Sequence, residues 1–175
     1  QSIGVPDLTY GWAKLTSEYL GKIAYKNYGI KSVVYRPFSG YGKDQDLSYP
    51  FPSICKRILN NISQKNIQVW GTGDQMRDFI HIEDCVRGVI STMDKIDDGS
   101  PINLSTGILT SFKEFVKLGC SILGFEIEVI GTSDKPEGVF ARGGDTKLQN
   151  DLGFFANIDF KNGIEEAFKF FDKIK

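Results

Sequence analysis

The chain has 175 residues, 41% of them hydrophobic and 25% charged, and its formal net charge at pH 7 is −1. Acidic and basic side chains are interspersed without a basic stripe, which argues against a nucleic-acid partner. No apolar run approaches the roughly 20 residues that a membrane span needs, so we expect a cytoplasmic protein with no membrane partner.

The first predicted elements are a long helix and a short strand. Over residues 9–27 apolar side chains recur at helical spacing, and Asn27-Tyr28-Gly29 supplies a stop signal. Residues 30–35 have the apolar, β-branched character of a buried strand. The segment 37–52 contains three prolines and two glycines, so we expect a loop there, and loops at strand ends often carry ligand contacts.

Strands and helices alternate along the rest of the chain. The sequence predicts helices over residues 51–59, 83–93, 111–123, 145–152 and 164–174, and strands over 67–70, 79–82, 102–104 and 126–130. Thr110-Ser111 is an N-cap signal for one helix, and Asp145 is an N-cap candidate for another. Residues 131–144 have no regular pattern. The alternation predicts an α/β fold.

The thiols and the single imidazole do not predict a metal site. Cys55, Cys85 and Cys120 lie among apolar neighbours in predicted helices and form no CxxC pair, so we expect buried free thiols in a reducing compartment. His81 has no second histidine or paired cysteines to complete a metal centre. We expect a structural hydrogen-bonding role for it.

Tyr10 and Lys14 are four residues apart near the start of the first predicted helix, so their side chains share one helix face. An ammonium beside a phenol favours the phenolate, which lets such a tyrosine move a proton to or from an alcohol. The same spacing is common on amphipathic helices, where it reflects packing and a solvated charge. Taken alone, the two residues leave both interpretations open.

Two further motifs follow Tyr10-Gly11-x-x-Lys14 in order. They are Arg36-Pro37-Phe38-x-x-Tyr41-Gly42 and Gly71-x-Gly73-x-x-x-Arg77-Asp78-Phe79-Ile80-His81. This succession resembles the C-terminal half of an extended short-chain dehydrogenase/reductase of the NAD-dependent nucleotide-sugar epimerase/dehydratase family. The resemblance covers essentially the whole chain.

The resemblance implies the C-terminal part of an NAD(P)-binding Rossmann-like fold together with a small α/β substrate-binding domain. Residues 1–37 would end the dinucleotide-binding domain with the catalytic helix and the following strand. Residues 38–175 would form mainly the substrate-binding domain, with a segment at about 78–95 returning to the Rossmann domain. Family members are roughly twice this length and no Gly-x-Gly-x-x-Gly is present, so we expect a fragment that lacks the N-terminal glycine-rich βαβ half.

The resemblance also implies a redox site. Tyr10 matches the acid/base that removes a sugar hydroxyl proton while hydride passes to NAD, and Lys14 matches the lysine that holds the nicotinamide ribose. Pro37 and Phe38 follow the next strand, where family members pass the backbone beside the nicotinamide. The expected cofactor is NAD, and NADP is not excluded because the residue that selects between them belongs to the absent half.

Arg77 and Arg142 are the predicted contacts to the pyrophosphate of a nucleotide sugar, because guanidinium groups bind phosphates with forked, charge-assisted hydrogen bonds. Asp145 would orient Arg142 or bind the nucleoside ribose, with plain N-capping as the alternative. Arg36 is better interpreted as an internal salt-bridge or backbone-binding residue than as a substrate contact.

Ser39 stands where family members often have a substrate-contacting asparagine, and a structural turn explains it equally well. Val69 and Trp70 would lie against the nucleotide base, unless they pack in the core. Residues 135–145 look most like the same stretch in epimerases and reductases of GDP-sugars. These include the GDP-mannose 3,5-epimerases, in which a lysine acts as a second acid/base where this chain has Tyr49.

The leading hypothesis is the C-terminal fragment of an NAD-dependent nucleotide-sugar epimerase that oxidises a sugar hydroxyl transiently. The fragment by itself is expected to be inactive. The alternatives are a nucleotide-sugar 4,6-dehydratase, an NADPH-dependent reductase, or a non-catalytic, cofactor-sensing binding protein of the same fold. The substrate would be a GDP-, UDP- or dTDP-linked sugar, and we expect a homodimer.

Overall fold

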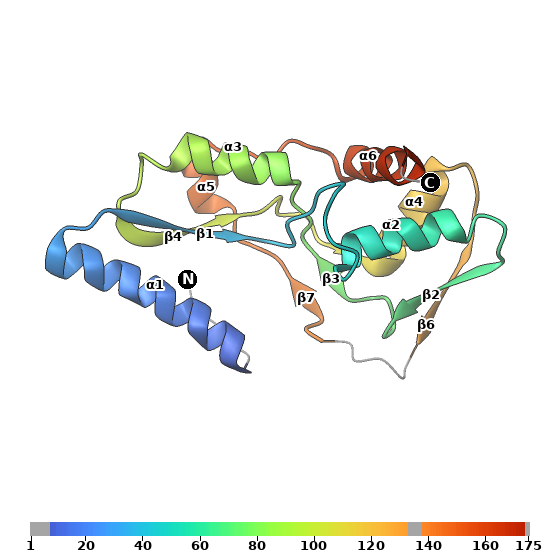
Figure 1. Ribbon diagram of the computed structural model, residues 1–175, viewed down its shortest axis with the longest axis horizontal. Helices are drawn as coiled ribbons and strands as arrows, with labels where there is room; N and C mark the ends of the chain where they lie inside the picture. The colour runs from blue at the N-terminus through green and yellow to red at the C-terminus, as the bar shows by residue number, and fades with distance from the viewer. Residues whose placement is uncertain (1–7, 133–137, 174–175) are drawn as a thin grey trace.

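The computed structural model describes residues 8–132 and 138–173, which form two lobes joined by several chain crossings (Figure 1). The first lobe contains α1 (Leu8–Tyr28), β1 (Ser32–Pro37), α3 (Ile82–Thr92), β4 (Asp98–Leu104) and α5 (Lys147–Asp151). The second contains α2 (Pro50–Asn60), β2 (Asn66–Trp70), β3 (Met76–Arg77), β5 (Thr110–Ser111), α4 (Phe112–Ile122), β6 (Glu128–Thr132), β7 (Ala141–Arg142) and α6 (Phe160–Lys173).

The first lobe is built on the parallel pair β1 and β4, in which Tyr35 is in register with Ile102 and Pro37 with Leu104. Helices α1 and α3 lie on opposite faces of this pair (Figure 1). A parallel pair covered on both faces requires apolar side chains in both directions. The core of this lobe contains Ile102 and Leu104 from β4, together with Ile80, Cys85 and Phe154.

A close approach of two glycines fixes the C-terminal half of α1 to this lobe. Gly99 has a φ of 75°, and a Cβ at this position would lie 2.8 Å from the backbone carbon of Gly21 in α1. Only glycine combines that backbone conformation with such a short contact. Toward its N-terminus α1 extends away from the strands (Figure 1).

The second lobe packs α2, α4 and α6 beside two small sheets (Figure 1). β2 and β6 run parallel, while β3 lies between β5, to which it is antiparallel, and β7, to which it is parallel. Its core is rich in aromatic rings: Phe79 and Phe160 stack with centroids 4.7 Å apart, and Phe51 and Phe115 stack at 5.5 Å. Such pairs add directional contacts to the area they bury.

Every predicted helix is present, and most boundaries move by a few residues. The predicted strand at 79–82 is wrong, because this segment makes only a single bridge, from His81 to Tyr41, before α3 begins. Phe79 and Ile80 are buried, one in each of the two cores, whereas Ile82 is exposed. Helix α5 begins after Thr146, although Oδ1 of Asp145 does accept a hydrogen bond from the backbone N–H of Lys147 (2.8 Å).

Two smaller predictions are confirmed. The three cysteines are buried free thiols, and burial raises the pKa of Cys85 and of Cys120 to about 11. His81 caps α3: its Nδ1 accepts from the backbone N–H of Glu83 (3.2 Å), and its Nε2 lies 3.2 Å from Oε2 of Glu166.

Within the described ranges, no helix is long and apolar enough to cross a membrane. The same residues contain no cluster of three or more histidine, cysteine or acidic side chains that would hold a metal ion.

Candidate functional site

Tyr10 and Lys14 lie on the part of α1 that extends away from the strands. The Lys14 Nζ is 5.5 Å from the centroid of the Tyr10 ring, so the ammonium sits over the aromatic face. The Tyr10 side chain is 71% exposed. The two side chains are therefore in contact with each other and accessible from solvent.

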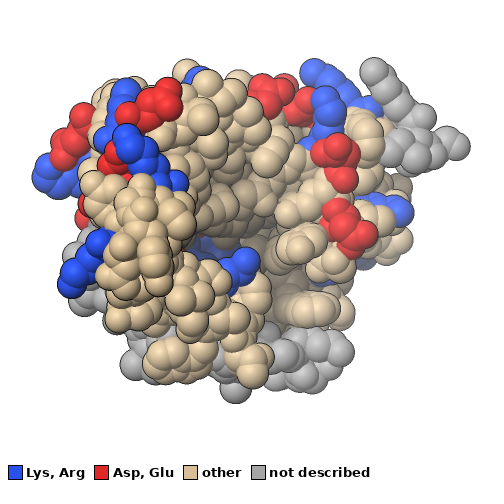
Figure 2. Space-filling model, turned by 60° about the vertical axis from the view of Figure 1, so that its left-hand side comes forward, with Lys and Arg blue, Asp and Glu red and all other residues tan. Residues whose placement is uncertain are grey.

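Further along α1, a cavity of about 570 Å³ opens between this helix, β4 and α5. Lys22, Asn103 and Asp145 contribute to its lining, together with Glu18 and Arg36. Figure 2, which brings the α1 side of the molecule forward, shows a hollow on this face with basic side chains inside it.

Arg36 ties the end of β1 to α1. Its Nε donates to Oε1 of Glu18 (2.7 Å), and its Nη2 donates to Oε2 of the same carboxylate. The pair is partly buried, with side-chain exposures of 27% and 16%, and the hydrogen bonds to Glu18 raise the pKa of Arg36. The sequence left a salt bridge and backbone binding open as structural roles for Arg36, and the structure shows the salt bridge.

The chain leaves β1 through Pro37, Phe38 and Ser39. The backbone N–H of Phe38 donates to the carbonyl of Leu104 (2.9 Å), and its ring lies so close to Gly144 that a Cβ there would come within 2.8 Å of it. Ser39 has a φ of 38° and is the single non-glycine residue with positive φ in the described part of the chain. That conformation is typical of a tight turn.

A second cavity, of about 200 Å³, lies between α2, β2 and β3. It brings together residues that the sequence analysis singled out in two separate segments: Tyr49 in one, and Val69, Trp70 and Arg77 in the other. The Trp70 ring is 61% exposed, whereas Val69 is buried and forms part of the cavity wall. An apolar wall beside an exposed aromatic ring and a guanidinium suits a ligand that is planar at one end and anionic at the other.

Arg77 and Arg142 stand directly opposite each other across β3 and β7. Nη1 of Arg77 donates to the carbonyls of Met76 (2.7 Å) and Val139 (2.9 Å), and its guanidinium lies 5.6 Å from the Phe112 ring centroid. Burial, and secondly the positive charge of Arg142, lower the pKa of Arg77. Neither guanidinium pairs with a carboxylate of any residue in the described ranges, so both keep donors for an anion.

Asp78 holds this pair in place. Its buried carboxylate accepts hydrogen bonds from the Ser105 hydroxyl, from the N–H (2.9 Å) and hydroxyl (2.7 Å) of Thr106, and from the N–H of Gly107 (3.0 Å). Its own backbone N–H donates to the carbonyl of Arg142 (3.1 Å). The residue after Arg77 thus joins β3 and β7 of the second lobe to the end of β4 in the first.

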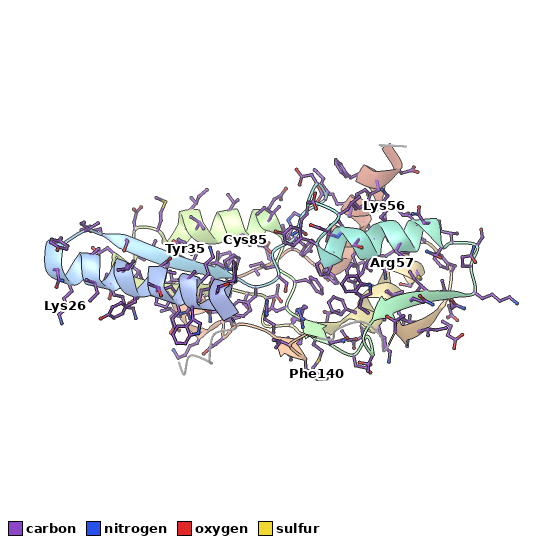
Figure 3. The ribbon with its side chains drawn as sticks, turned by 60° about the horizontal axis from the view of Figure 1, so that its bottom comes forward. Lys26, Tyr35, Lys56, Arg57, Cys85 and Phe140 are labelled. Carbon is purple, nitrogen blue, oxygen red and sulfur yellow. The ribbon has the colours of Figure 1, made fainter. Side chains whose placement is uncertain are left out.

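The structure adds two residues to the cavity that the sequence reasoning missed. Arg57 lies on the β2 side of α2 (Figure 3) and donates from Nη1 to the carbonyl of Gln68 (2.6 Å). Gln75 is only 2% exposed, and its Oε1 has no hydrogen-bond partner among the residues that the structure describes. Arg57 lies in the predicted helix 51–59, where no motif pointed to a binding residue. Gln75 lies within the motif that contains Arg77, two residues before it, and this position was the one sequence feature that could have indicated a role in the site.

Asp145 is not brought to this cavity. It lines the other one, beside α1, and the amide of Asn103 donates to its backbone carbonyl (3.1 Å). The predicted site residues therefore fall into two groups, one along α1, the end of β1 and α5, and one around β2, β3 and β7.

The model of the "NAD dependent epimerase/dehydratase family" matches residues 3–105. Among curated proteins, the chain is 24% identical over 168 residues to "Probable GDP-L-fucose synthase 1" of Oryza sativa subsp. japonica, a match that covers 93% of this chain and 51% of the relative. It is 29% identical over 168 residues to GDP-mannose 3,5-epimerase of Arabidopsis thaliana, covering 91% and 42%. The chain spans about half the length of the curated relatives it matches.

Solved structures show the same fold. RMD from Pseudomonas aeruginosa complexed with NADPH superposes with a TM-score of 0.86 at 22% identity, over 99% of this chain and 59% of that chain. UDP-glucuronic acid 4-epimerase from Bacillus cereus, in complex with UDP-glucuronic acid and NAD, gives 0.85 at 24% identity, over 99% and 55%. The fold is thus the α/β Rossmann-like fold of these enzymes.

Proposed function

Because the chain belongs to the NAD dependent epimerase/dehydratase family, we propose that it is the C-terminal part of an NAD-dependent nucleotide-sugar epimerase. The observation that carries the proposal is the contact between the Lys14 ammonium and the exposed Tyr10 ring. NADP is the alternative cofactor. Residues 1–37 and about 78–95 are assigned to the dinucleotide-binding domain, and most of 38–175 to the substrate-binding domain.

The donors on α1 fit a nicotinamide ribose. Lys14 offers an ammonium, and the nearest carboxylate on its helix face, that of Glu18, is occupied by Arg36. When bound, NAD supplies hydride acceptance and return. Tyr10 takes the proton of the sugar hydroxyl as the alcohol becomes a ketone and gives it back when the alcohol reforms, so no net oxidation occurs.

The β2–β3 cavity is assigned to the nucleotide. Arg77 and Arg142 would clamp the pyrophosphate, since two guanidinium groups side by side, neither with a carboxylate partner among the described residues, match two phosphates. Val69 and Trp70 would hold the base, with Arg57 and the carboxamide of Gln75 as further polar contacts. Ser39, in the turn after β1, is assigned to the sugar. Asp145, which lines the cavity beside α1, is assigned to the part of the substrate that extends from Arg142 toward that cavity.

The test is proton NMR of the full natural gene product in D2O with GDP-, UDP- and dTDP-sugars and NAD. The expected result is a new sugar stereoisomer with no net redox change, and Tyr10→Phe should remove most of this turnover. Loss of water would identify a dehydratase instead, and consumption of NADPH a reductase. If no nucleotide sugar reacts and Tyr10→Phe leaves the cellular function intact, the protein is a cofactor-sensing binding protein.

A further inference from the structure

The contact between Arg36 and Glu18 has a consequence for Lys14. Lys14 and Glu18 are four residues apart on α1, the spacing at which a lysine and a glutamate on one helix face attract each other. Yet both oxygens of Glu18 are bound by Arg36, and the Lys14 ammonium lies over the Tyr10 ring instead. We propose that Arg36 is a positioning residue that keeps Glu18 from capturing Lys14. This inference rests on the proposed function.

The geometry favours the Arg36 contact over the helical one. A guanidinium binds a carboxylate through two parallel N–H donors, whereas an ammonium on a flexible stem gives a single, more mobile contact. Arg36 and Glu18 are also partly shielded from water, which strengthens their attraction relative to that of an exposed pair. As long as the fork is intact, the guanidinium charge and its two hydrogen bonds offset the attraction of Glu18 for Lys14.

Other charges near this part of α1 determine what happens when Arg36 is removed. Lys22 lies four residues beyond Glu18 on the same face, so a released Glu18 carboxylate would divide between Lys14 and Lys22. Asp98, the first residue of β4, interacts electrostatically with Lys22, so Lys22 competes less strongly with Lys14 for the released carboxylate. The contact between Lys14 and Tyr10 is lost only in those molecules in which Glu18 binds Lys14.

The proposal predicts an asymmetry that a purely structural salt bridge does not. In the full natural gene product, Arg36→Met should lower kcat about tenfold, while KM for the nucleotide sugar should change by less than about threefold. The double variant Glu18→Gln/Arg36→Met removes the competing carboxylate and should return kcat to within about threefold of wild type. Adding Lys22→Met to Arg36→Met should deepen the loss.

A spectroscopic readout keeps this test independent of the proposed reaction. The Tyr10 ring shifts the NMR signals of the Lys14 side chain that lies over it. This ring-current shift, assigned by its loss in Tyr10→Leu, should shrink in Arg36→Met and return in the double variant. Lys31→Met is the matched control, because Lys31 forms an exposed ion pair with Asp97 in the same lobe; it should change neither signal. If Arg36→Met does not fold, Arg36→Lys, which keeps the charge but loses the fork, should give the same changes at smaller size.

Equal loss of kcat in the single and double variants, with equal Lys14 signals, would overturn the proposal and leave Arg36 a structural residue. Absence of turnover in every variant, with the predicted changes in the Lys14 signals present, would instead contradict the proposed function and support the role of Arg36.

Discussion

Arg77 and Arg142 face each other in register across β3 and β7, and neither is paired with a carboxylate in the described part of the chain. Two like charges held side by side repel each other, and an anion that shares their donors would relieve this repulsion. The Asp78 carboxylate, the residues around it and the close fit at Gly144 hold these two strand ends in position.

Replacing either arginine should weaken the binding of a nucleotide sugar. Arg77→Met and Arg142→Met each remove charge-assisted hydrogen bonds, so Kd for a nucleoside diphosphate should rise about 10- to 100-fold. Isothermal titration calorimetry at two salt concentrations measures this. Lys56→Met, an exposed change on α2 next to Arg57, is the control. Unchanged affinity in both arginine variants would show that the phosphates bind elsewhere.

Asp78→Asn should destabilise the protein by about 2–3 kcal/mol, because an amide turns N–H donors toward the backbone N–H groups of Thr106 and Gly107. Urea unfolding followed by circular dichroism gives the difference in free energy of unfolding. Asp94→Asn, at an exposed position just after α3, should change it little. A loss as small as that of the control would mean that water replaces the network.

Gly144→Ala should cost about 1–3 kcal/mol, because the new methyl group would lie within 2.8 Å of both the Phe38 ring and the Ser105 Cβ. Gly40→Ala adds the same methyl group where its neighbours stand at 3.9 Å and should be tolerated. Thermal unfolding followed by circular dichroism gives the melting temperature of each variant. If the two melting temperatures are equal, the Phe38 ring moves away from the new methyl group without loss of stability.

Acid should destabilise the wild type more than a Glu166→Gln variant. The Lys43 ammonium, with a smaller effect from His81, lowers the pKa of Glu166. Its ionised form therefore stabilises the fold above the unfolded pKa of about 4.3, and this contribution is lost as pH falls through the lower folded value. The effect is below about 1 kcal/mol because the side chain is partly exposed. Urea unfolding between pH 6 and pH 3 measures it, and Glu165→Gln should follow the wild type.

The sequence was sufficient to predict those helix ends that are determined by neighbouring residues in the chain. The capping box of Ser111 and Glu114 begins α4 where Thr110-Ser111 predicted it, and the glycine stop after α1 is confirmed by the φ of 68° at Gly29. Residues 79–82 were misjudged because a short apolar run has the same pattern whether it forms a strand or simply fills two cores.

The site depended on pairings between segments far apart in the chain. The motif around Arg77 could be seen, but its register with Arg142 arises from β3 and β7, which are two residues long and carry no strand pattern. Burial of Gln75 and Asp78 is likewise set by neighbours from β4 and α4 rather than by the local sequence. The functional roles of Tyr10 and Lys14 stay predictions that only activity measurements test.

The Asp78 network lies where the two lobes meet, since its donors follow β4 while its own backbone is tied to β7. In the proposed enzyme, the groups that handle the sugar hydroxyl belong to one lobe and the arginines that hold the phosphates belong to the other. In that enzyme the hydrogen bonds of Asp78 would fix the distance between Tyr10 and the two arginines. The site would then select a ligand by the number of bonds between its reacting carbon and its phosphates, as well as by its charge.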